Sequence, residues 1–268
     1  MGTSISWATE VWNYVTGCTK LLADCDHCYA EALSRKRGWS QHPWDKAHEG
    51  ENIVLHPERL DKPRHWWRPR RIFVNSMSDA FHPRIPEDLT FRAFDIMCEV
   101  DRHVYLILTK RPQRVRPVVE RYLASRGLAR LPEHIWIGTS LGIRAARFRL
   151  DQLREAAAIV PSLWVSFEPL LEALGDLDLT GIGWVVVGGE SGQDFRPMDH
   201  AWARAIRDQC VARGIPFFFK QSAAPRTEMG TALIEADGTR NEWRQVPASW
   251  RTHSLPTGHS ARRRKRTR

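Results

Sequence analysis

Six short hydrophobic runs recur along the chain, and their spacing limits the possible fold more than any other feature. The runs are RIFVNSMSD (71–79), VYLILTKRP (104–112), IWIGTS (135–140), LWVSFEP (163–169), WVVVGGESG (184–192) and IPFFFKQ (215–221). Such runs are typical of strands buried on both faces of a parallel sheet. Their starts fall mostly about 30 residues apart, the length of one βα unit. Helical patterns occupy 87–100, 145–158 and 200–213. The sequence therefore predicts an α/β fold, a parallel (β/α) barrel or partial barrel of the TIM type.

The periodic part of the chain ends near residue 221. A weaker strand pattern at 10–17 precedes the six runs, which makes 1–221 the predicted barrel domain. Residues 222–268 lack the periodicity and are predicted to form an irregular or hairpin-like extension. This extension ends in a basic tail at 262–268, which is predicted to be disordered.

Two basic stretches raise the question of nucleic-acid binding. The tail supplies six of the nine excess positive charges of the chain, and it contains no acidic residue. Such a tail contacts polyanions without sequence specificity. The stretch RHWWRPRR (64–71) interleaves two tryptophans with arginines, a pattern that stacks on bases and holds phosphates. Ordinary solvated surface is the alternative interpretation for both stretches.

The cysteine content predicts a cytoplasmic protein. Five cysteines, three of them between positions 18 and 28, suit a reducing compartment with metal-binding or catalytic thiols better than a disulfide scaffold. The first residues lack the pattern of a secretory signal. No apolar run approaches the roughly 18 residues that span a bilayer, so no membrane association is predicted.

Each hydrophobic run ends in polar or charged side chains. The residues at these ends are Asn75, Ser76, Ser78 and Asp79; Thr109, Lys110 and Arg111; Thr139 and Ser140; Ser166 and Glu168; Gly188, Gly189 and Glu190; Lys220 and Gln221. In a parallel barrel the carboxyl ends of the strands converge on one mouth, where active sites are built. These residues are therefore predicted to form an active rim, the alternative being salt bridges between neighbouring strand ends.

Cys18, Cys25 and Cys28 follow the first predicted strand and admit three interpretations. Cys25 and Cys28 with His42 and His48 fit a loose zinc-finger spacing, C-x2-C-x13-H-x5-H, which leaves Cys18 without a role. Free cysteines are also often buried as small hydrophobic residues. The third interpretation is an iron–sulfur cluster, for which thiolate is the normal ligand. Three thiolates leave one iron open, as catalytic metal sites require.

The sequence is similar to the phage Gp37/Gp68-like family of radical S-adenosylmethionine-type proteins, described by a three-cysteine motif. The similarity covers about residues 7–221. It rests on TGCTK and CDHCYA, RIFVNSMSDAFH, LTKRP, SFEPLL, VVGGESG with RPM, and DQC with GIPFFFKQ, in that order. The first gap between cysteines is six residues, which agrees with this family and departs from the C-x3-C-x2-C spacing of most radical enzymes. Leu141, Gly142, Ser222 and Ala223 depart from the family pattern.

The resemblance implies a [4Fe-4S] cluster held by Cys18, Cys25 and Cys28, with S-adenosylmethionine on its free iron. Reductive cleavage of the sulfonium then gives a 5′-deoxyadenosyl radical, which abstracts hydrogen from a substrate. The implied cofactor-binding residues are Asn75, Ser76, Ser78 and Asp79 near the methionine ammonium, and Gly188, Gly189 and Glu190 in a Gly-rich loop. The implied catalytic residues are Lys110, Arg111, Glu168 and Lys220, with Lys110 and Arg111 able to pair with a carboxylate or phosphate.

These features predict a radical S-adenosylmethionine enzyme that requires an electron donor. A nucleic-acid base is the predicted target, which corresponds to DNA modification or repair. Three alternatives stay open at this point. They are a zinc-containing nucleic-acid-binding protein without catalysis, a radical enzyme acting on a peptide, and a barrel whose cluster is only structural.

Overall fold

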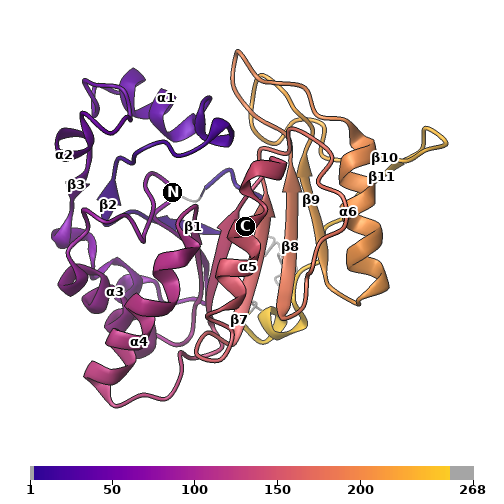
Figure 1. Ribbon diagram of the computed structural model, residues 1–268. Helices are drawn as coiled ribbons and strands as arrows, with labels where there is room; N and C mark the ends of the chain where they lie inside the picture. The colour runs from indigo at the N-terminus through magenta and orange to yellow at the C-terminus, as the bar shows by residue number, and fades with distance from the viewer. Residues whose placement is uncertain (1–2, 254–268) are drawn as a thin grey trace, which may run out of the picture.

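A curled, seven-stranded parallel sheet forms the centre of the molecule (Figure 1). The computed structural model describes residues 3–253. The strands are β1 (Glu10–Trp12), β4 (Arg71–Val74), β5 (Val104–Thr109), β6 (Ile135–Ser140), β7 (Ser162–Phe167), β8 (Ile182–Gly188) and β9 (Phe217–Gln221). They lie in this order across the sheet, and every neighbouring pair is parallel. The predicted partial (β/α) barrel is confirmed, because each of the six hydrophobic runs contributes one strand.

Helices cover the convex outer face of the sheet, and α1 lies beyond the carboxyl ends of the strands (Figure 1). The helices are α1 (Tyr29–Lys36), α2 (Glu49–Asn52), α3 (Glu87–Glu99), α4 (Val115–Arg126), α5 (Phe148–Arg154) and α6 (His200–Ala212). The patterns predicted at 87–100, 145–158 and 200–213 correspond to α3, α5 and α6. The helix α4 was not predicted, although its buried residues Val115, Val118, Val119, Tyr122 and Leu123 have helical spacing.

The two faces of the sheet are packed differently. The outer face carries aliphatic side chains such as Ile72 and Ile107 against the helices. The inner face carries Trp164 and Trp184, which pack with Trp7 and other aromatic residues. Gly138 makes room for this packing, because a Cβ there would lie 2.6 Å from the Trp164 indole nitrogen. The aromatic cluster fills the inside of the half-barrel below its carboxyl end and leaves that end for a site.

Two small hairpins complete the described fold. Strand β2 (Val15–Thr16) pairs antiparallel with β3 (Val54–Leu55) beside the cysteine segment. Strand β10 (Leu233–Ile234) pairs antiparallel with β11 (Arg240–Asn241). The second hairpin agrees with the predicted hairpin-like extension, and the chain after it returns to the sheet, where Trp184 Nε1 donates to the Gln245 carbonyl at 2.9 Å. The domain boundary at residue 221 stays a prediction, and the basic tail at 262–268 lies outside the described residues.

Short 3-10 helices connect several of these elements. They are η1 (Ala23–Cys25), η2 (Pro57–Arg59), η3 (Lys62–His65), η4 (Pro112–Arg114), η5 (Arg144–Ala146) and η6 (Ala248–His253). Within residues 3–253, no helix combines the length and the apolar character that crossing a membrane demands.

Candidate active site

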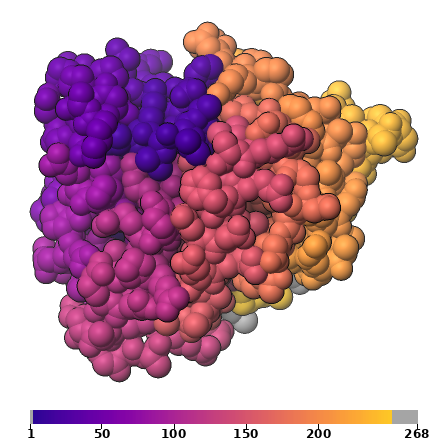
Figure 2. Space-filling model, viewed as in Figure 1, coloured from indigo at the N-terminus to yellow at the C-terminus, as the bar shows by residue number. Residues whose placement is uncertain are grey.

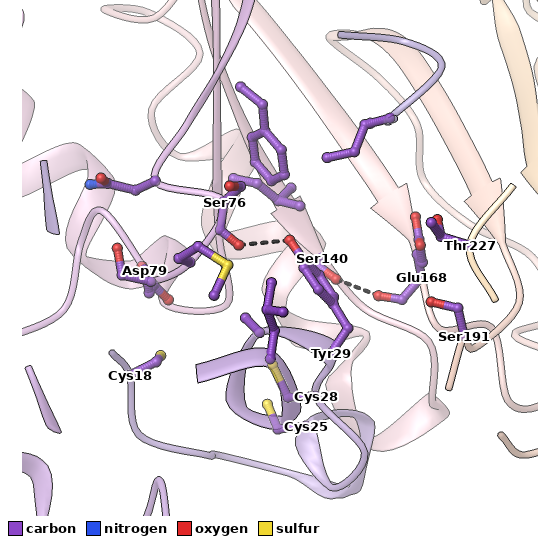
Figure 3. A pocket seen from close by; sticks show the side chains of 18 of the residues that line it. Cys18, Cys25, Cys28, Tyr29, Ser76, Asp79, Ser140, Glu168, Ser191 and Thr227 are labelled. Carbon is purple, nitrogen blue, oxygen red and sulfur yellow. Dashed lines mark hydrogen bonds between the residues drawn. The ribbon is translucent and has the colours of Figure 1, made fainter. Parts of the chain in front are cut away.

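A cavity of about 670 Å³ lies at the carboxyl ends of the strands (Figure 3). Residues at or just after the carboxyl ends of all seven sheet strands line it, together with much of the segment 13–30. The predicted site residues that line it are Cys18, Cys25, Cys28, Asn75, Ser76, Ser78, Asp79, Lys110, Arg111, Glu168, Glu190 and Lys220. Gly188 and Gly189 are not among its lining residues. The folded chain therefore gathers side chains from distant parts of the sequence around one space.

The three clustered cysteines reach this cavity from three different local structures. Cys18 follows β2, Cys25 ends η1, and Cys28 is the residue before α1. Gly17 fixes the position of Cys18, because its φ of 88° is in the left-handed region. A Cβ at Gly17 would also lie 1.8 Å from the Asn52 carbonyl oxygen, so a side chain cannot be accommodated there. The TGC motif thus needs its glycine for both backbone conformation and space.

Burial raises the pKa of two of these thiols. It raises the pKa of Cys18 to about 12, with the Asp79 carboxylate adding to the rise and the Arg111 guanidinium opposing it. Burial also raises the pKa of Cys28, against the opposing effect of the Glu31 and Ala30 backbone N–H groups, which donate to its sulfur. A neutral thiol is a poor nucleophile, which argues against covalent catalysis by these cysteines alone. Metal coordination deprotonates thiols and overcomes this barrier.

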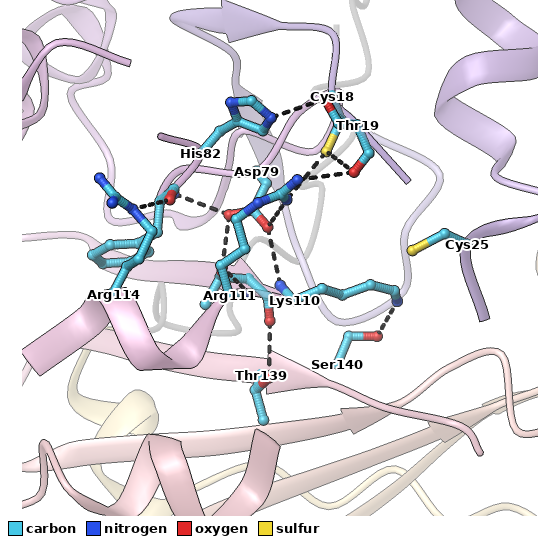
Figure 4. A network of polar contacts seen from close by, with 12 residues as sticks. Cys18, Thr19, Cys25, Asp79, His82, Lys110, Arg111, Arg114, Thr139 and Ser140 are labelled. Carbon is cyan, nitrogen blue, oxygen red and sulfur yellow. Dashed lines mark hydrogen bonds and ion pairs between the residues drawn. The ribbon is translucent and has the colours of Figure 1, made fainter. Parts of the chain in front are cut away.

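Arg111 connects the end of β5 to the cysteine segment (Figure 4). Its Nη1 lies 2.9 Å from Asp79 Oδ2 and 3.6 Å from Cys18 Sγ, and its Nη2 donates to the Thr19 carbonyl at 2.9 Å. Asp79 also accepts from Thr109 Oγ1 at 2.6 Å and from the Lys110 backbone N–H at 3.0 Å. Two residues predicted to bind ligands are therefore paired with each other, and Arg111 presents a positive charge to Cys18.

A buried ion pair anchors the stretch between Cys18 and Cys25. Arg149 Nη1, on α5, lies 2.6 Å from Asp24 Oδ2, and the two side chains are 1% and 0% exposed. The same nitrogen donates to the Ser140 carbonyl at 2.9 Å. Lys110 Nζ lies 3.6 Å from Asp24 Oδ2 and donates to Ser140 Oγ at 2.7 Å (Figure 4). Asp24 therefore ties the cysteine segment to two strand ends and a helix.

A third arginine secures the same stretch from the other side. Arg196 Nη1 donates to the Ala23 carbonyl at 2.9 Å, while its Nη2 pairs with Glu190 Oε1 at 2.5 Å. Glu190 also contacts His27, with 3.1 Å between Oε2 and Nδ1. Figure 2 shows the indigo early part of the chain packed directly against the orange later part on this face. Arg111, Arg149 and Arg196 thus hold the backbone or side chains of residues 19–24 from three separate elements.

Lys220 and Glu168 form an ion pair across the ends of β9 and β7. The distance between Lys220 Nζ and Glu168 Oε1 is 2.5 Å. Gly188 gives the Glu168 side chain its space, since a Cβ there would lie 3.2 Å from Glu168 Cδ. Gly189 is constrained more severely, because a Cβ there would lie 2.1 Å from the backbone nitrogen of Ala223. In the structure these two glycines permit close packing within the protein.

The polar residues after β4 are largely engaged with the neighbouring backbone. Asn75 has a positive φ of 55°, and its Oδ1 accepts from the N–H groups of Tyr14 and Val15, both at 3.2 Å. Ser78 Oγ donates to the Val15 carbonyl at 3.0 Å. The buried Nδ2 of Asn75 has no hydrogen-bond partner within the described residues. Asn75 lines the cavity, and its side chain also interacts with the Tyr14 hydroxyl, which opposes the burial-induced rise in the pKa of that phenol.

Tyr29 and Asp24 also line the cavity, but the sequence analysis did not single them out. Tyr29 is 46% exposed, and its Oη donates to the Ser76 carbonyl at 2.6 Å (Figure 3). The position of Tyr29 next to Cys28 is the sequence signal that could have identified it. Asp24 is likewise next to a cysteine, Cys25, but its pairing with Arg149, 125 residues away, has no signal in the sequence.

The zinc-finger set is not assembled. His42 and His48 stack on each other with ring centroids 4.4 Å apart, and they pair with Glu51 and Asp45. Across residues 3–253, no group of three or more His, Cys, Asp or Glu side chains converges on a position for one metal ion. Within the described residues, Cys25, Cys28, His42 and His48 are therefore not gathered as the ligands of one zinc ion.

The stretch 64–71 lies away from the cavity. It leads into the amino end of β4, whereas the cavity lies at the carboxyl ends of the strands. Arg64 is engaged by Asp61 and Glu99, and Trp67 is 92% exposed. Any nucleic acid bound there would contact the opposite end of the sheet from the cysteines.

The cavity fits the cofactors implied by the sequence resemblance. In an iron–sulfur cluster different thiolates bind different irons, so thiols distributed around a cavity suit a cluster better than a single ion. N–H donors point at Cys18 and Cys28, and such donors stabilise cluster sulfurs. The volume of the cavity is in the range of ligand pockets. Cys18, Cys25 and Cys28 are therefore a suitable donor set for a cluster with an adjoining cofactor.

Comparison with known proteins gives one family match. The family model described as "Protein of unknown function (DUF5131)" matches residues 2–255. No curated protein matches the sequence.

Among solved structures, the chain is similar to spore photoproduct lyase. One structure, a complex with dinucleoside spore photoproduct, has a TM-score of 0.42 at 13% identity and covers 78% of this chain and 62% of that one. A substituted form with bound AdoMet and dinucleoside spore photoproduct has a TM-score of 0.44 at 13% identity, and covers 78% and 63%. The chain thus spans less than two thirds of the length of these structures.

Proposed function

This chain belongs to the DUF5131 family, and we propose that it is a radical S-adenosylmethionine enzyme. Cys18, Cys25 and Cys28 hold a [4Fe-4S] cluster at the carboxyl end of the half-barrel. The supporting observation is that all three thiols line one cavity together with the charged strand ends. The sequence resemblance to Gp37/Gp68-like proteins agrees with this proposal.

The residues around the cavity have distinct tasks in this proposal. When bound, the cluster and S-adenosylmethionine supply reductive cleavage of the sulfonium and a carbon-centred radical. Arg111 donates to Cys18 Sγ, which stabilises a thiolate there. The ion pair of Asp24 and Arg149 fixes the cysteine segment, and Lys110 adds positive charge near Cys28. Asn75 Nδ2 donates to an acceptor of the bound cofactor.

Glu168 and Lys220 are proposed to orient the cofactor or substrate. They form a charge pair on the cavity wall, so that each can exchange its partner for a ligand group of matching charge. Glu190 is held by Arg196 and His27, and its proposed task is to position the cofactor side of the cavity. The predicted target is a nucleic-acid base, and the reaction requires an electron donor.

Anaerobic reconstitution tests the proposal. The protein is expected to bind iron and sulfide in equal amounts, about four of each per chain. After reduction with S-adenosylmethionine it is expected to release 5′-deoxyadenosine. A variant with His42→Ala and His48→Ala is expected to retain both properties. Tightly bound zinc without iron, lost in that variant, would support the zinc-binding alternative and overturn the proposal.

A further inference from the structure

The opening of the cavity carries two arginines on different segments. Arg37 follows α1, and Arg226 lies in the loop after β9; both line the cavity and are exposed. Thr227, next to Arg226, lies on the opposite side of the cavity from Cys18 (Figure 3). Gln221, fully buried at the end of β9, anchors this loop, because its Oε1 accepts from Thr227 Oγ1 at 3.0 Å and from the Glu228 N–H at 2.6 Å.

Among the charged side chains that line the cavity within residues 3–253, these two arginines lack an oppositely charged partner. Its four acidic side chains are each paired with a cation: Asp24 with Arg149, Asp79 with Arg111, Glu168 with Lys220 and Glu190 with Arg196. Within residues 3–253, neither Arg37 nor Arg226 has a carboxylate partner. The opening is therefore positive, and its free guanidinium groups suit phosphate oxygens.

An aromatic surface adjoins Arg37. Trp39 lines the cavity and is 52% exposed, and the Arg37 guanidinium carbon lies 5.0 Å from its ring centroid. Trp44, deeper in the cavity wall, is 2% exposed, and its buried Nε1 has no hydrogen-bond partner in the described part of the chain. An exposed indole next to a free guanidinium is a platform for a planar ring that carries an adjacent phosphate.

We propose that this opening binds a nucleotide within a single nucleic-acid strand and directs its base toward the cysteines. Trp39 stacks on a base, while Arg37 and Arg226 hold phosphates on the two sides of the opening. Binding of the strand at the opening depends only on the side chains of the cavity wall, whatever reaction the cavity supports. The further statement that the strand is the substrate rests on the radical-enzyme function proposed above.

The chain offers a matched control at its other end. Trp67 is an exposed tryptophan in a basic stretch, but it precedes β4 and does not line the cavity. Arg116, on α4, is an exposed arginine paired with Glu120. Substitutions of Trp67 and Arg116 remove the same kinds of side chain as substitutions at the opening. All variants keep residues 262–268, so that any contribution of the basic tail is common to them.

Fluorescence anisotropy with a labelled twelve-residue oligothymidylate and the reconstituted full chain tests the proposal. Trp39→Ala is expected to weaken binding about 5- to 150-fold, the range for loss of one stacked base. Arg37→Gln and Arg226→Gln are each expected to lower the slope of log K against log salt by about 1. Trp67→Ala and Arg116→Gln are expected to bind like the unaltered protein. Thymidine monophosphate is expected to compete only weakly.

Several outcomes would overturn the proposal. Equal affinity of the three opening variants and the unaltered protein excludes this opening as the binding site. Equal competition by thymidine monophosphate excludes a strand as the ligand, and displacement by an uncharged peptide at the same concentration excludes a nucleotide. Cys18→Ala is expected to keep oligonucleotide binding while losing 5′-deoxyadenosine formation. Failure of the proposed radical-enzyme function would appear in 5′-deoxyadenosine formation, and failure of the proposed strand-binding site would appear in oligonucleotide binding. The two results are therefore distinguishable.

Discussion

Cys18→Ala is expected to reduce 5′-deoxyadenosine formation at least about a hundredfold, because changes outside the first coordination shell already cost about 10–100-fold. Cys18 is one of the three thiols on the cavity wall, and Arg111 directs a guanidinium nitrogen at its sulfur. Without it, Cys25 and Cys28 are the only remaining clustered thiols. Iron and sulfide per chain after reconstitution are expected to fall with the activity, and both are measured by colorimetric assay.

Cys98→Ala is the matched control for this substitution. Cys98 lies on α3, where its sulfur is 3.5 Å from Tyr122 Oη, and it does not line the cavity. The variant is expected to retain iron, sulfide and 5′-deoxyadenosine formation. Retention of the full cluster by Cys18→Ala, or equal losses in the two variants, would show that Cys18 is not a ligand.

Arg149→Ala is expected to lower the free energy of unfolding by about 3–5 kcal/mol, which is the cost of leaving one partner of a buried ion pair alone. Asp24 would lose its direct ion pair and keep the more distant Lys110, 3.6 Å from Nζ to Oδ2. The cysteine segment would also lose its tie to α5 and to the Ser140 carbonyl. Urea denaturation, followed by circular dichroism, measures the change.

Two further variants identify the cause of this effect. Arg116→Ala removes an exposed arginine from a surface pair and is expected to change the free energy of unfolding by less than about 1 kcal/mol. Combining Asp24→Leu with Arg149→Met removes both buried charges and is expected to recover much of the lost stability. If the double variant is as unstable as Arg149→Ala, the unpaired Asp24 carboxylate is not the cause.

The sheet could be predicted from the sequence because its strands are buried on both faces. Residues of β6 and β7 are buried at every position, and this burial requires the continuous hydrophobic runs that the sequence displays. The parallel direction followed from the helices between the runs. The location of the active rim could then be predicted, because parallel strands have their carboxyl ends on the same side of the sheet.

The pairing within the site could not be predicted in the same way. Asp79 and Arg111 were both predicted as ligand-binding groups from their positions at strand ends, and the structure pairs them with each other. Asp24 and Arg149 meet only through the tertiary packing of η1 against α5. Local patterns identify which side chains reach the rim, but charge pairing depends on distances across the cavity. Trp39 was not predicted as a site residue either, because it follows α1 in the sequence and reaches the cavity only through the tertiary fold.

The central claim is that the three thiols leave one iron open to S-adenosylmethionine inside this cavity. Electron–nuclear double resonance on the reduced, reconstituted protein tests it directly, with S-adenosylmethionine carrying nitrogen-15 in its amino group. The predicted result is a hyperfine coupling to nitrogen-15 that is absent without the cofactor. An iron–sulfur signal that is unchanged by S-adenosylmethionine and shows no such coupling would contradict the claim.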